Sequence, residues 1–335
     1  MKQLNRRNFI KLSAFTGAGL SLGFHGAYAG PFKNSQKGKR VGIIGLDTSH
    51  SVAFTKSLNS NTSNTEFLGY KVVAAYPQGS KNIKSSVDRV PEYTKNVKEQ
   101  GVEIVDSIEA LLEKVDVVLL ESNDGRVHLE QAIPVLKAGK RMFIDKPIAA
   151  SYKDAKAIFD LAEKQNVAIF SSSSLRYING MDKVLNGEVG EILGAHTYSP
   201  AHLEATHPDM FWYGIHGIEM LFTIMGTGCE SVTRVHQEDV DVLVGKWKDG
   251  RIGTFRGTRS GKSDYGGTVF GKKSNLKLGS FKGYDPLLKE IVKFFDSGVA
   301  PVDPQETLEI CAFIEAADRS KENKGSSTPL ETIIK

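Results

Sequence analysis

A lysine at the end of an apolar run is the side chain of this sequence most suited to proton transfer. Residues 142–144 read as a buried strand, and the chain then continues Asp145-Lys146-Pro147. In an open α/β sheet, ligands collect where strands end, and a lysine fixed there by a following proline would point into a cleft. A plain surface turn explains the same three residues without chemistry. Lys146 is therefore the candidate general acid or base, with a surface turn as the alternative.

The segment around Lys146 has a recognisable order of elements. A buried strand over 115–120 leads through a polar loop with Asn123 and His128 into a helix that ends Ala-Gly-Lys, and the strand before Asp145 follows. This order resembles the Gfo/Idh/MocA oxidoreductases, in which the loop before the histidine is shorter and the second strand ends Glu-Lys-Pro. The resemblance implies an α/β fold, with a Rossmann-like parallel sheet domain followed by an α+β domain that has an open antiparallel sheet.

Strand and helix patterns divide the chain on the same plan. Residues 40–172 alternate apolar strands and helices, as a parallel dinucleotide-binding sheet does. Residues 173–335 are predicted to form the substrate and oligomerisation domain. Its strands are expected over 192–198, 231–237, 240–247, 252–258 and 267–272.

The turn after the first strand departs from the family pattern. A Gly-x-Gly-x-x-Gly fingerprint lets the backbone approach a pyrophosphate at a helix N-terminus. This chain reads Gly45-Leu46-Asp47-Thr48-Ser49-His50, so Asp47 and His50 replace the second and third glycines. A carboxylate about 5 Å from a phosphate would cost roughly 3 kcal/mol at an effective dielectric near 20. Either Asp47 caps the helix that begins near Ser49, or Asp47, Thr48 and His50 line the cleft and contact a ligand.

A dinucleotide is expected in spite of this departure, bound more weakly than by relatives with all three glycines. Its phosphate would lie on Thr48 and Ser49, and a protonated His50 would offset Asp47. The loop over 77–81 is basic and polar and follows a strand without a terminal acid, so it suits NADP at least as well as NAD. The candidate cofactor-binding residues are Gly45, Asp47, Thr48, Ser49, His50, Asn123, His128 and Lys146.

A second group of candidate residues lies near the middle of the chain. The resemblance implies that His216 is the family's active-site histidine, and that Trp212 stands where the family has a catalytic aspartate. Tyr213 precedes His216 by one helical turn and would share its face, similar to the Tyr-x-x-His of NAD-dependent glycosidases in the same superfamily. A buried core histidine is the alternative for His216. Lys146, His216 and Tyr213 are the predicted catalytic residues.

The loop before these residues could be interpreted as a metal site. It holds His202, Glu204, His207 and Asp209, but their spacing fits no metal-binding motif. A substrate-facing loop is the prediction, and no metal is expected.

Three functions agree with these patterns. The first is an exported NAD(P)-dependent oxidoreductase that transfers hydride at a CH–OH group of a sugar, sugar derivative or polyol, with Lys146 as general acid or base. The second is a glycosidase or lyase of the same superfamily that acts through transient oxidation. The third is a sugar-binding protein that kept the fold and lost the cofactor, which Asp47 and Trp212 would permit.

The balance of charged residues limits the classes of binding partner that we expect. The 335 residues hold 43 basic and 39 acidic side chains; residues 1–29 carry four of the basic ones and no acid, so their removal leaves 39 of each. Such a balance does not indicate nucleic acid or a membrane surface as a partner. A small-molecule carbohydrate is expected, and copies of the chain could associate through the antiparallel sheet. Cys229 and Cys311 are expected to be two buried thiols rather than a disulfide.

The first residues predict export. Residues 5–11 match the twin-arginine pattern, and the weakly apolar stretch that follows ends Ala27-Tyr28-Ala29, an A-x-A cleavage site. Residues 1–29 are therefore a predicted signal peptide, residues 30–39 a linker, and the periplasm the expected location.

Changing both Arg6 and Arg7 to Lys should leave the precursor inside the cell, because the twin-arginine pathway reads the arginine pair. Immunoblots of periplasmic and cytoplasmic fractions measure the distribution. Equal periplasmic amounts of the parent and the variant would contradict twin-arginine export.

Overall fold

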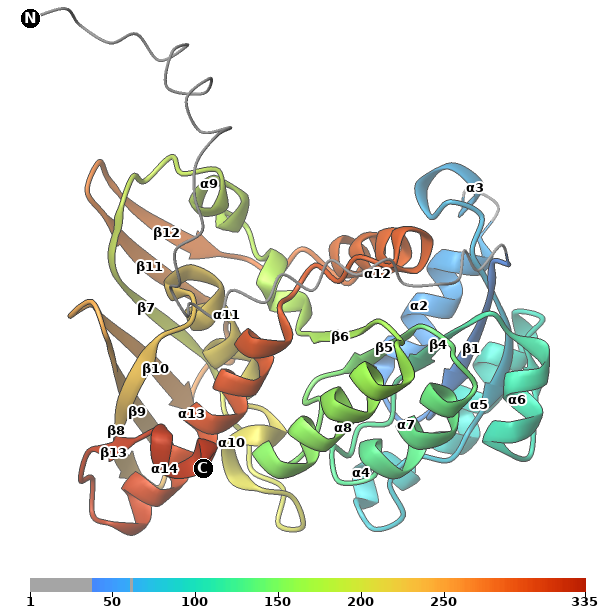
Figure 1. The fold of residues 1–335 in the computed structure, drawn as a ribbon, viewed down its shortest axis with the longest axis horizontal. Helices are drawn as coiled ribbons and strands as arrows, with labels where there is room; N and C mark the ends of the chain where they lie inside the picture. Colours follow the sequence, from blue (N-terminus) through green and yellow to red (C-terminus); the bar gives the residue numbers. More distant parts are fainter. Residues whose placement is uncertain (1–37, 61–62) are drawn as a thin grey trace, which may run out of the picture. The chain divides into compact units, whose positions relative to one another are not determined.

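A computed structural model describes residues 38–60 and 63–335, which contain two β-sheets (Figure 1). The predicted leader lies outside these residues, so export stays a prediction. Within them, no helix is long and apolar enough to cross a membrane. The predicted fold class, a Rossmann-like parallel sheet followed by an α+β part, is confirmed.

The first sheet has six parallel strands in the order β3-β2-β1-β4-β5-β6. Their bounds are β1 (Arg40–Ile44), β2 (Lys71–Tyr76), β3 (Glu103–Ile104), β4 (Val117–Leu120), β5 (Met142–Asp145) and β6 (Ile169–Ser172). All four residues of β4 are buried, as expected for a parallel strand covered by helices on both faces. Strand order reverses between β1 and β4, which is where such sheets bind ligands.

Helices connect these strands, and two of them begin at serine caps. The helices are α2 (Ser49–Asn59), α3 (Ser63–Glu66), α4 (Lys84–Val87), α5 (Val90–Glu99), α6 (Ile108–Lys114), α7 (His128–Lys137) and α8 (Tyr152–Gln165). Ser107 Oγ accepts a hydrogen bond from the Ala110 N–H at the start of α6, and Ser151 Oγ accepts one from the Asp154 N–H at the start of α8.

The second sheet has the order β12-β11-β7-β10-β9-β8-β13. Its strands are β7 (Ile192–Pro200), β8 (Cys229–Gln237), β9 (Val240–Trp247), β10 (Ile252–Thr258), β11 (Gly266–Gly271), β12 (Asn275–Gly279) and β13 (Thr328–Pro329). The expected antiparallel sheet needs one correction, because β7 and β10 pair in parallel. The reason is that helices follow β7, and the chain then forms the β8-β9-β10 meander. The last strand of this meander, β10, runs in the same direction as β7 and pairs with it.

Helices cover this sheet and join it to the first. They are η1 (Ser174–Tyr177), α9 (Met181–Leu185), α10 (Asp209–Trp212), α11 (Ile215–Met225), α12 (Asp285–Ser297), α13 (Pro304–Glu322) and α14 (Glu331–Ile334). Phe222 of α11 packs on both Trp247 of β9 and Phe313 of α13, with ring centroids 5.5 and 5.4 Å apart. Cys229 and Cys311 are buried and unpaired, as predicted. Association of copies through the sheet stays a prediction.

Helix α12 crosses back to the first sheet. Figure 1 shows it beside α2, far from it in sequence. Phe294 contacts Phe170 of β6 edge to face at 4.9 Å, and Phe295 contacts Tyr70 before β2. The core on this face of the first sheet therefore includes residues from the C-terminal part of the chain.

A buried arginine joins the second sheet to α10. The fully buried guanidinium of Arg234 binds Asp241 of β9 at 2.7 Å, Asp318 of α13 at 2.5 Å and Asp209 of α10 at 2.9 Å. Asp209 also binds Lys321 at 2.9 Å. Because α10 leads directly to the predicted site residue Tyr213, these ion pairs hold that segment in place.

Replacing Arg234 with Met should lower the free energy of unfolding by about 3–5 kcal/mol, because buried carboxylates lose their counter-charge. Urea titration measures the change. Lys272→Met, which breaks an ion pair exposed on both sides, is the control and should leave stability nearly unchanged. Equal losses in both variants would show that the Arg234 ion pairs do not hold this segment.

Candidate functional site

A cavity of about 330 Å³ brings most of the predicted site residues together. One part of its wall comes from loops and helices at the first sheet: Thr48, Ser49, His50, Ser85, Arg89, Asn123, Asp145 and Lys146. The other part is rich in aromatic rings: Ser174, Leu175, His202, Trp212, Tyr213, His216, Tyr265, Phe281 and Tyr284. All three predicted catalytic residues lie on this one cavity, although their roles stay predictions.

Lys146 reaches the cavity from the end of β5, as its position after a buried strand indicated. Asp145 Oδ1 accepts a hydrogen bond from the Lys146 backbone N–H at 2.8 Å. The Lys146 side chain is buried except for a small exposed fraction on the cavity. The surface-turn alternative is therefore wrong.

His216 is held as a neutral donor. Its Nδ1 lies 2.7 Å from Ser173 Oγ, and this Oγ accepts a hydrogen bond from the Leu175 N–H. Donation of the Ser173 hydroxyl proton to Nδ1 would leave the imidazole proton on Nε2. Burial, and then the charge of Lys146, lower the pKa of His216 well below its ordinary value. His216 thus presents an uncharged N–H donor.

Glu219 fixes the segment that holds His216. Its carboxylate accepts hydrogen bonds from Ser172 Oγ and the Ser173 N–H, both at 2.8 Å, and pairs with Arg176 at 3.1 Å. These contacts join α11 to the chain that follows β6. The orientation of His216 therefore depends on a buried charge pair one helical turn away.

Aromatic side chains form the opposite wall. The hydroxyl groups of Tyr213 and Tyr265 lie 2.8 Å apart, and the Tyr213 ring lies 5.0 Å from that of His216. Trp212 also reaches the cavity, at the position where the family pattern has an aspartate. The wall combines apolar ring faces with hydroxyl groups that can donate or accept hydrogen bonds.

Asp47 has a different role from both of those expected. Helix α2 has Thr48 at its N-cap position, and no side chain caps it. The fully buried Asp47 carboxylate instead accepts hydrogen bonds from the Ser80 N–H at 3.0 Å and the Asn123 N–H at 2.9 Å. It therefore ties the loop after β2 to the loop after β4. The helix-cap interpretation is wrong, and Asp47 does not line the cavity.

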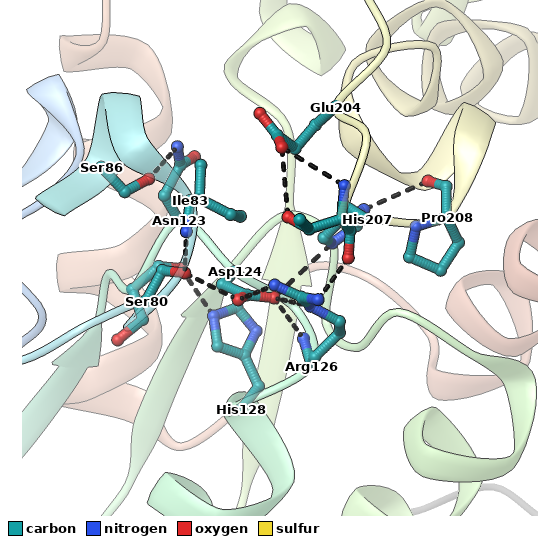
Figure 2. A network of polar contacts seen from close by, with 12 residues as sticks. Ser80, Ile83, Ser86, Asn123, Asp124, Arg126, His128, Glu204, His207 and Pro208 are labelled. Carbon is teal, nitrogen blue, oxygen red and sulfur yellow. Dashed lines mark hydrogen bonds and ion pairs between the residues drawn. The ribbon is translucent and has the colours of Figure 1, made fainter.

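The same two loops are joined by a polar network around Asp124 (Figure 2). Asp124 accepts hydrogen bonds from Ser80 Oγ at 2.9 Å and from Arg126 Nε at 2.8 Å. Arg126 also binds Asn82 at 2.7 Å and donates to the Thr206 carbonyl. The loop after β4 is thus anchored both to the loop after β2 and to the segment after β7.

Two predicted cofactor residues have structural roles. Gly45 has φ of +88°, and a Cβ there would lie 2.5 Å from the Ser122 nitrogen, so only glycine fits. His128 is fully buried, with Nε2 2.6 Å from the Ser122 carbonyl oxygen and Nδ1 3.2 Å from that of Ile148. Neither residue lines the cavity, so direct ligand contact by Gly45 or His128 is not supported.

The four residues considered as metal ligands in the loop after β7 are dispersed. His202 lines the cavity, whereas His207 packs against Trp212 at 5.2 Å. Burial lowers the pKa of His207 to about 4. Asp209 binds Arg234, as described above. A substrate-facing role fits His202 alone.

One cluster on the cavity was missed by the sequence analysis. Glu121, directly after β4, is fully buried, and its Oε2 lies 3.8 Å from His50 Nδ1. Burial, and then the nearby Asp145 carboxylate, raise the pKa of Glu121 well above its ordinary value. Burial acts in the same direction on Asp145, but the charges of His50 and Lys146 outweigh it and lower the pKa of Asp145 to about 2. A charged residue right after a buried strand, the signal that indicated Lys146, could have identified Glu121.

A family model described as an oxidoreductase family with an NAD-binding Rossmann fold, GFO_IDH_MocA, matches residues 39–173. This match covers the first sheet and its helices, so this part of the chain is similar to the Gfo/Idh/MocA oxidoreductases. The resemblance drawn from the sequence around Lys146 is thereby confirmed.

The individual proteins that this chain is similar to are distant in sequence. An uncharacterized oxidoreductase of Streptococcus pneumoniae serotype 4 is 24% identical over 180 residues, which span about half of each protein, 48% in both cases. A probable dehydrogenase from Thermotoga maritima has a TM-score of 0.71 at 22% identity, covering 88% of this chain and 99% of that one. Scyllo-inositol dehydrogenase from Lactobacillus casei, solved with NAD(H) and scyllo-inositol, has a TM-score of 0.69 at 15% identity, covering 88% and 100%. Both of these solved structures have the same fold as this chain.

The cavity residues fit a phosphate of a nicotinamide nucleotide, a cofactor type that the family implies. Thr48 Oγ1 is buried without a hydrogen-bond partner, and the first turn of α2 carries no acidic residue. A helix N-terminus of this kind favours a phosphate. Asn123 and Lys146 face the same space. We expect the phosphate at Thr48 and Ser49. Asp47 stands at the position of the second fingerprint glycine, and its carboxylate is bound by the Ser80 and Asn123 N–H groups, so a phosphate does not fit there.

A second cavity, of about 770 Å³, is lined in part by residues next to the Asp47 tie. It is lined from the segments 76–82, 107–109 and 124–137 and includes Lys81 of the loop predicted to suit either NAD or NADP. Asn123 lines the first cavity, while Gly79 and Asp124 line the second. The chain neighbours of the two residues tied by Asp47 therefore line the second cavity, while Asn123 itself lines the first.

The Asp47 tie should make stability depend on pH. Burial raises the pKa of Asp47 from 3.8 to about 6. A carboxyl group whose pKa is higher in the folded than in the unfolded state stabilises the fold at a pH below its unfolded-state pKa. This stabilisation is lost as the pH rises through its folded-state pKa. The unfolding free energy of the parent, relative to that of Asp47→Asn, should therefore fall by about 3 kcal/mol between about pH 3.5 and 7. Urea titrations across this range measure it, and a constant difference would contradict the raised pKa.

Proposed function

We propose that this protein is an exported NAD(P)-dependent oxidoreductase that transfers hydride at a CH–OH group of a sugar, sugar derivative or polyol. The observation that carries the proposal is the convergence of Lys146, His216 and Tyr213 on one cavity. Such a cavity suits a polyhydroxylated ring, because hydroxyl groups need polar partners while the C–H faces pack on aromatic rings. The Lactobacillus casei relative, which binds NAD(H) and scyllo-inositol, supports the same substrate class.

In this proposal Lys146 moves the proton. Thr48, Ser49 and Asn123 hold the nucleotide, and bound NAD or NADP supplies or accepts the hydride. During reduction the Lys146 ammonium donates a proton to the carbonyl oxygen of the substrate, and during oxidation the amine takes the proton from the hydroxyl group. The position of Lys146 at the end of β5 places this group on the cavity wall.

His216 and Tyr213 position the substrate. The Nε2–H of neutral His216 donates a hydrogen bond to the reacting oxygen and adds no charge beside Lys146. The Tyr213 hydroxyl, paired with that of Tyr265 at 2.8 Å, is available for a second substrate hydroxyl. The ring faces of Trp212 and Phe281 exclude water from the same space.

The predicted leader supports a periplasmic site of action. Twin-arginine export carries folded proteins, which suits an enzyme that takes up its nucleotide in the cytoplasm, where nucleotides are made. Export of a protein already loaded with cofactor is part of the proposal.

Lys146→Met should lower turnover by at least about two orders of magnitude, the usual scale for loss of a general acid or base. The reduced-nicotinamide absorbance reports turnover on a panel of inositols, aldoses and sugar derivatives with NAD or NADP. Calorimetry should show that the variant still binds nucleotide. Lys153→Met, at an exposed position of α8, is the matched control and should behave like the parent.

Three outcomes would contradict this proposal. Parent-like turnover by Lys146→Met would remove its assigned role. Net hydrolysis or elimination of a sugar without reduced nicotinamide would favour a glycosidase or lyase. Absence of nucleotide binding in the parent protein would favour a sugar-binding protein.

A further inference from the structure

We propose that His50, Glu121 and Asp145 bind a divalent transition-metal ion, of the zinc or manganese class, at the wall of the cavity. This inference goes beyond the hydride-transfer proposal and does not rest on it. It concerns a donor set that the sequence did not reveal, because its members are separated by up to 95 positions between His50 and Asp145.

The fold brings the three donors together. His50 lies in the first turn of α2 after β1, Glu121 follows β4, and Asp145 is the last residue of β5. These three strands are neighbours in a parallel sheet, so their carboxyl ends meet at one edge. One nitrogen and two carboxylate oxygens, one from each residue, lie within 4.8 Å of one another, and all three residues are buried.

The spacing of the donors matches that around a bound ion. His50 Nδ1 lies 3.1 Å from Asp145 Oδ1 and 3.8 Å from Glu121 Oε2. Metal bonds of about 2.0–2.2 Å at octahedral or tetrahedral angles place neighbouring donors about 3.0–3.6 Å apart. The third pair of donors, the oxygens of Glu121 and Asp145, lies within 4.8 Å, so side-chain shifts of about 1 Å would complete the site.

The donor atoms also lack other partners. Both Glu121 carboxylate oxygens, Asp145 Oδ2 and His50 Nδ1 are buried and make no hydrogen bond among the described residues. The 3.1 Å approach of His50 to Asp145 does not have hydrogen-bond geometry. Buried carboxylates without compensation are strongly unfavourable. These unpartnered atoms, aimed into one small space, indicate a ligand.

A cation compensates this group better than a proton does. A proton on Glu121 would satisfy one oxygen and leave its second oxygen, Asp145 Oδ2 and His50 Nδ1 without partners. A divalent ion accepts a lone pair from each residue and balances the two carboxylate charges. The Lys146 N–H, which donates to Asp145 Oδ1 at 2.8 Å, would orient this ligand from outside the site.

The donor set defines the class of metal and its use. One imidazole with two carboxylates suits zinc, manganese or ferrous ion, whereas magnesium prefers oxygen ligands. Three protein ligands leave at least one open coordination position, as catalytic sites do. His50 and Asp145 line the cavity, so the open position would face it. A substrate oxygen bound there would lie beside Lys146.

Binding can be measured without any substrate. The full-length protein, stripped with a chelator and desalted, is titrated with Zn²⁺ and with Mn²⁺ by calorimetry, and bound metal is counted by mass spectrometry after gel filtration. We expect one ion per chain and a higher melting temperature in its presence. Glu121→Gln should weaken binding by about tenfold or more, because binding needs the deprotonated carboxylate. Asp47→Asn changes a buried carboxylate at the same sheet edge outside the cluster, and should bind like the parent.

Circular dichroism establishes that each variant is folded, and His50→Gln replaces Glu121→Gln if the latter is not. The proposal is overturned if the parent binds neither ion, or if folded Glu121→Gln or His50→Gln binds as the parent does. Equal weakening in Asp47→Asn would also overturn it, because the effect would then be general to this edge. Nucleotide titrations of the same samples test the hydride-transfer proposal separately, so the failure of one is distinguishable from the failure of the other.

Discussion

Burial of carboxylates at one sheet edge is the constraint on which this site depends. Asp47, Glu121 and Asp145 follow or end β1, β4 and β5, and all three are fully buried. Asp47 is compensated by two backbone N–H groups, which sets the conformation of the loops after β2 and β4. Asp145 Oδ1 accepts a hydrogen bond from the Lys146 N–H and lies 3.1 Å from His50 Nδ1, while Asp145 Oδ2 has no hydrogen-bond partner among the described residues. Glu121 differs from both, because its buried carboxylate makes no hydrogen bond within the described part of the chain and its oxygens stay available to a ligand.

The two walls of the cavity are connected through adjacent strands. Asp145 of β5 is paired with Ser172 of β6, so Lys146 and Ser173 follow at neighbouring strand ends. Ser173 contacts His216, and Glu219 holds Ser173. The proton-transfer group and the donor that positions the substrate are thus set by one strand pair, although they lie 70 positions apart in sequence. Large relative movement of Lys146 and His216 would require breaking the buried Glu219 contacts.

Local sequence patterns predicted what depends on local structure. The alternation of strands and helices and the position of Lys146 at a strand end follow from spacing along the chain. The shared helix face expected for Tyr213 and His216 is wrong, because Tyr213 lies in the turn between α10 and α11, although both side chains reach the cavity. Partners of buried polar groups are set by the tertiary fold and were not predictable in this way. Asp47 was expected at a helix cap or in the cleft, yet its partners come from two other loops, the farther at Asn123. Tyr265 reached the site without any sequence signal, because only the sheet order brings it there.

The parallel pairing of β7 with β10 has a similar origin. Each of these strands was recognised from its own residues, but their relative direction depends on the path of the helices between them. Strand β12 was missed because Asn275–Gly279 has only five residues, too few for its alternation of Leu276 and Leu278 with polar residues to stand out. His128 looked like a ligand-binding residue in its loop, whereas the backbone carbonyl groups around it engage both ring nitrogens.

The return of α12 to the first sheet has a consequence for biosynthesis. Leu288, Ile291 and Phe294 belong to the apolar cover of strands that are translated long before them. Until α12 has emerged from the ribosome, that face of the sheet exposes Phe54 and Phe170 to water. Domains usually fold as units during synthesis, N-terminal part first. Here the N-terminal sheet cannot complete its core until nearly the whole polypeptide has been made, so its folding is largely post-translational.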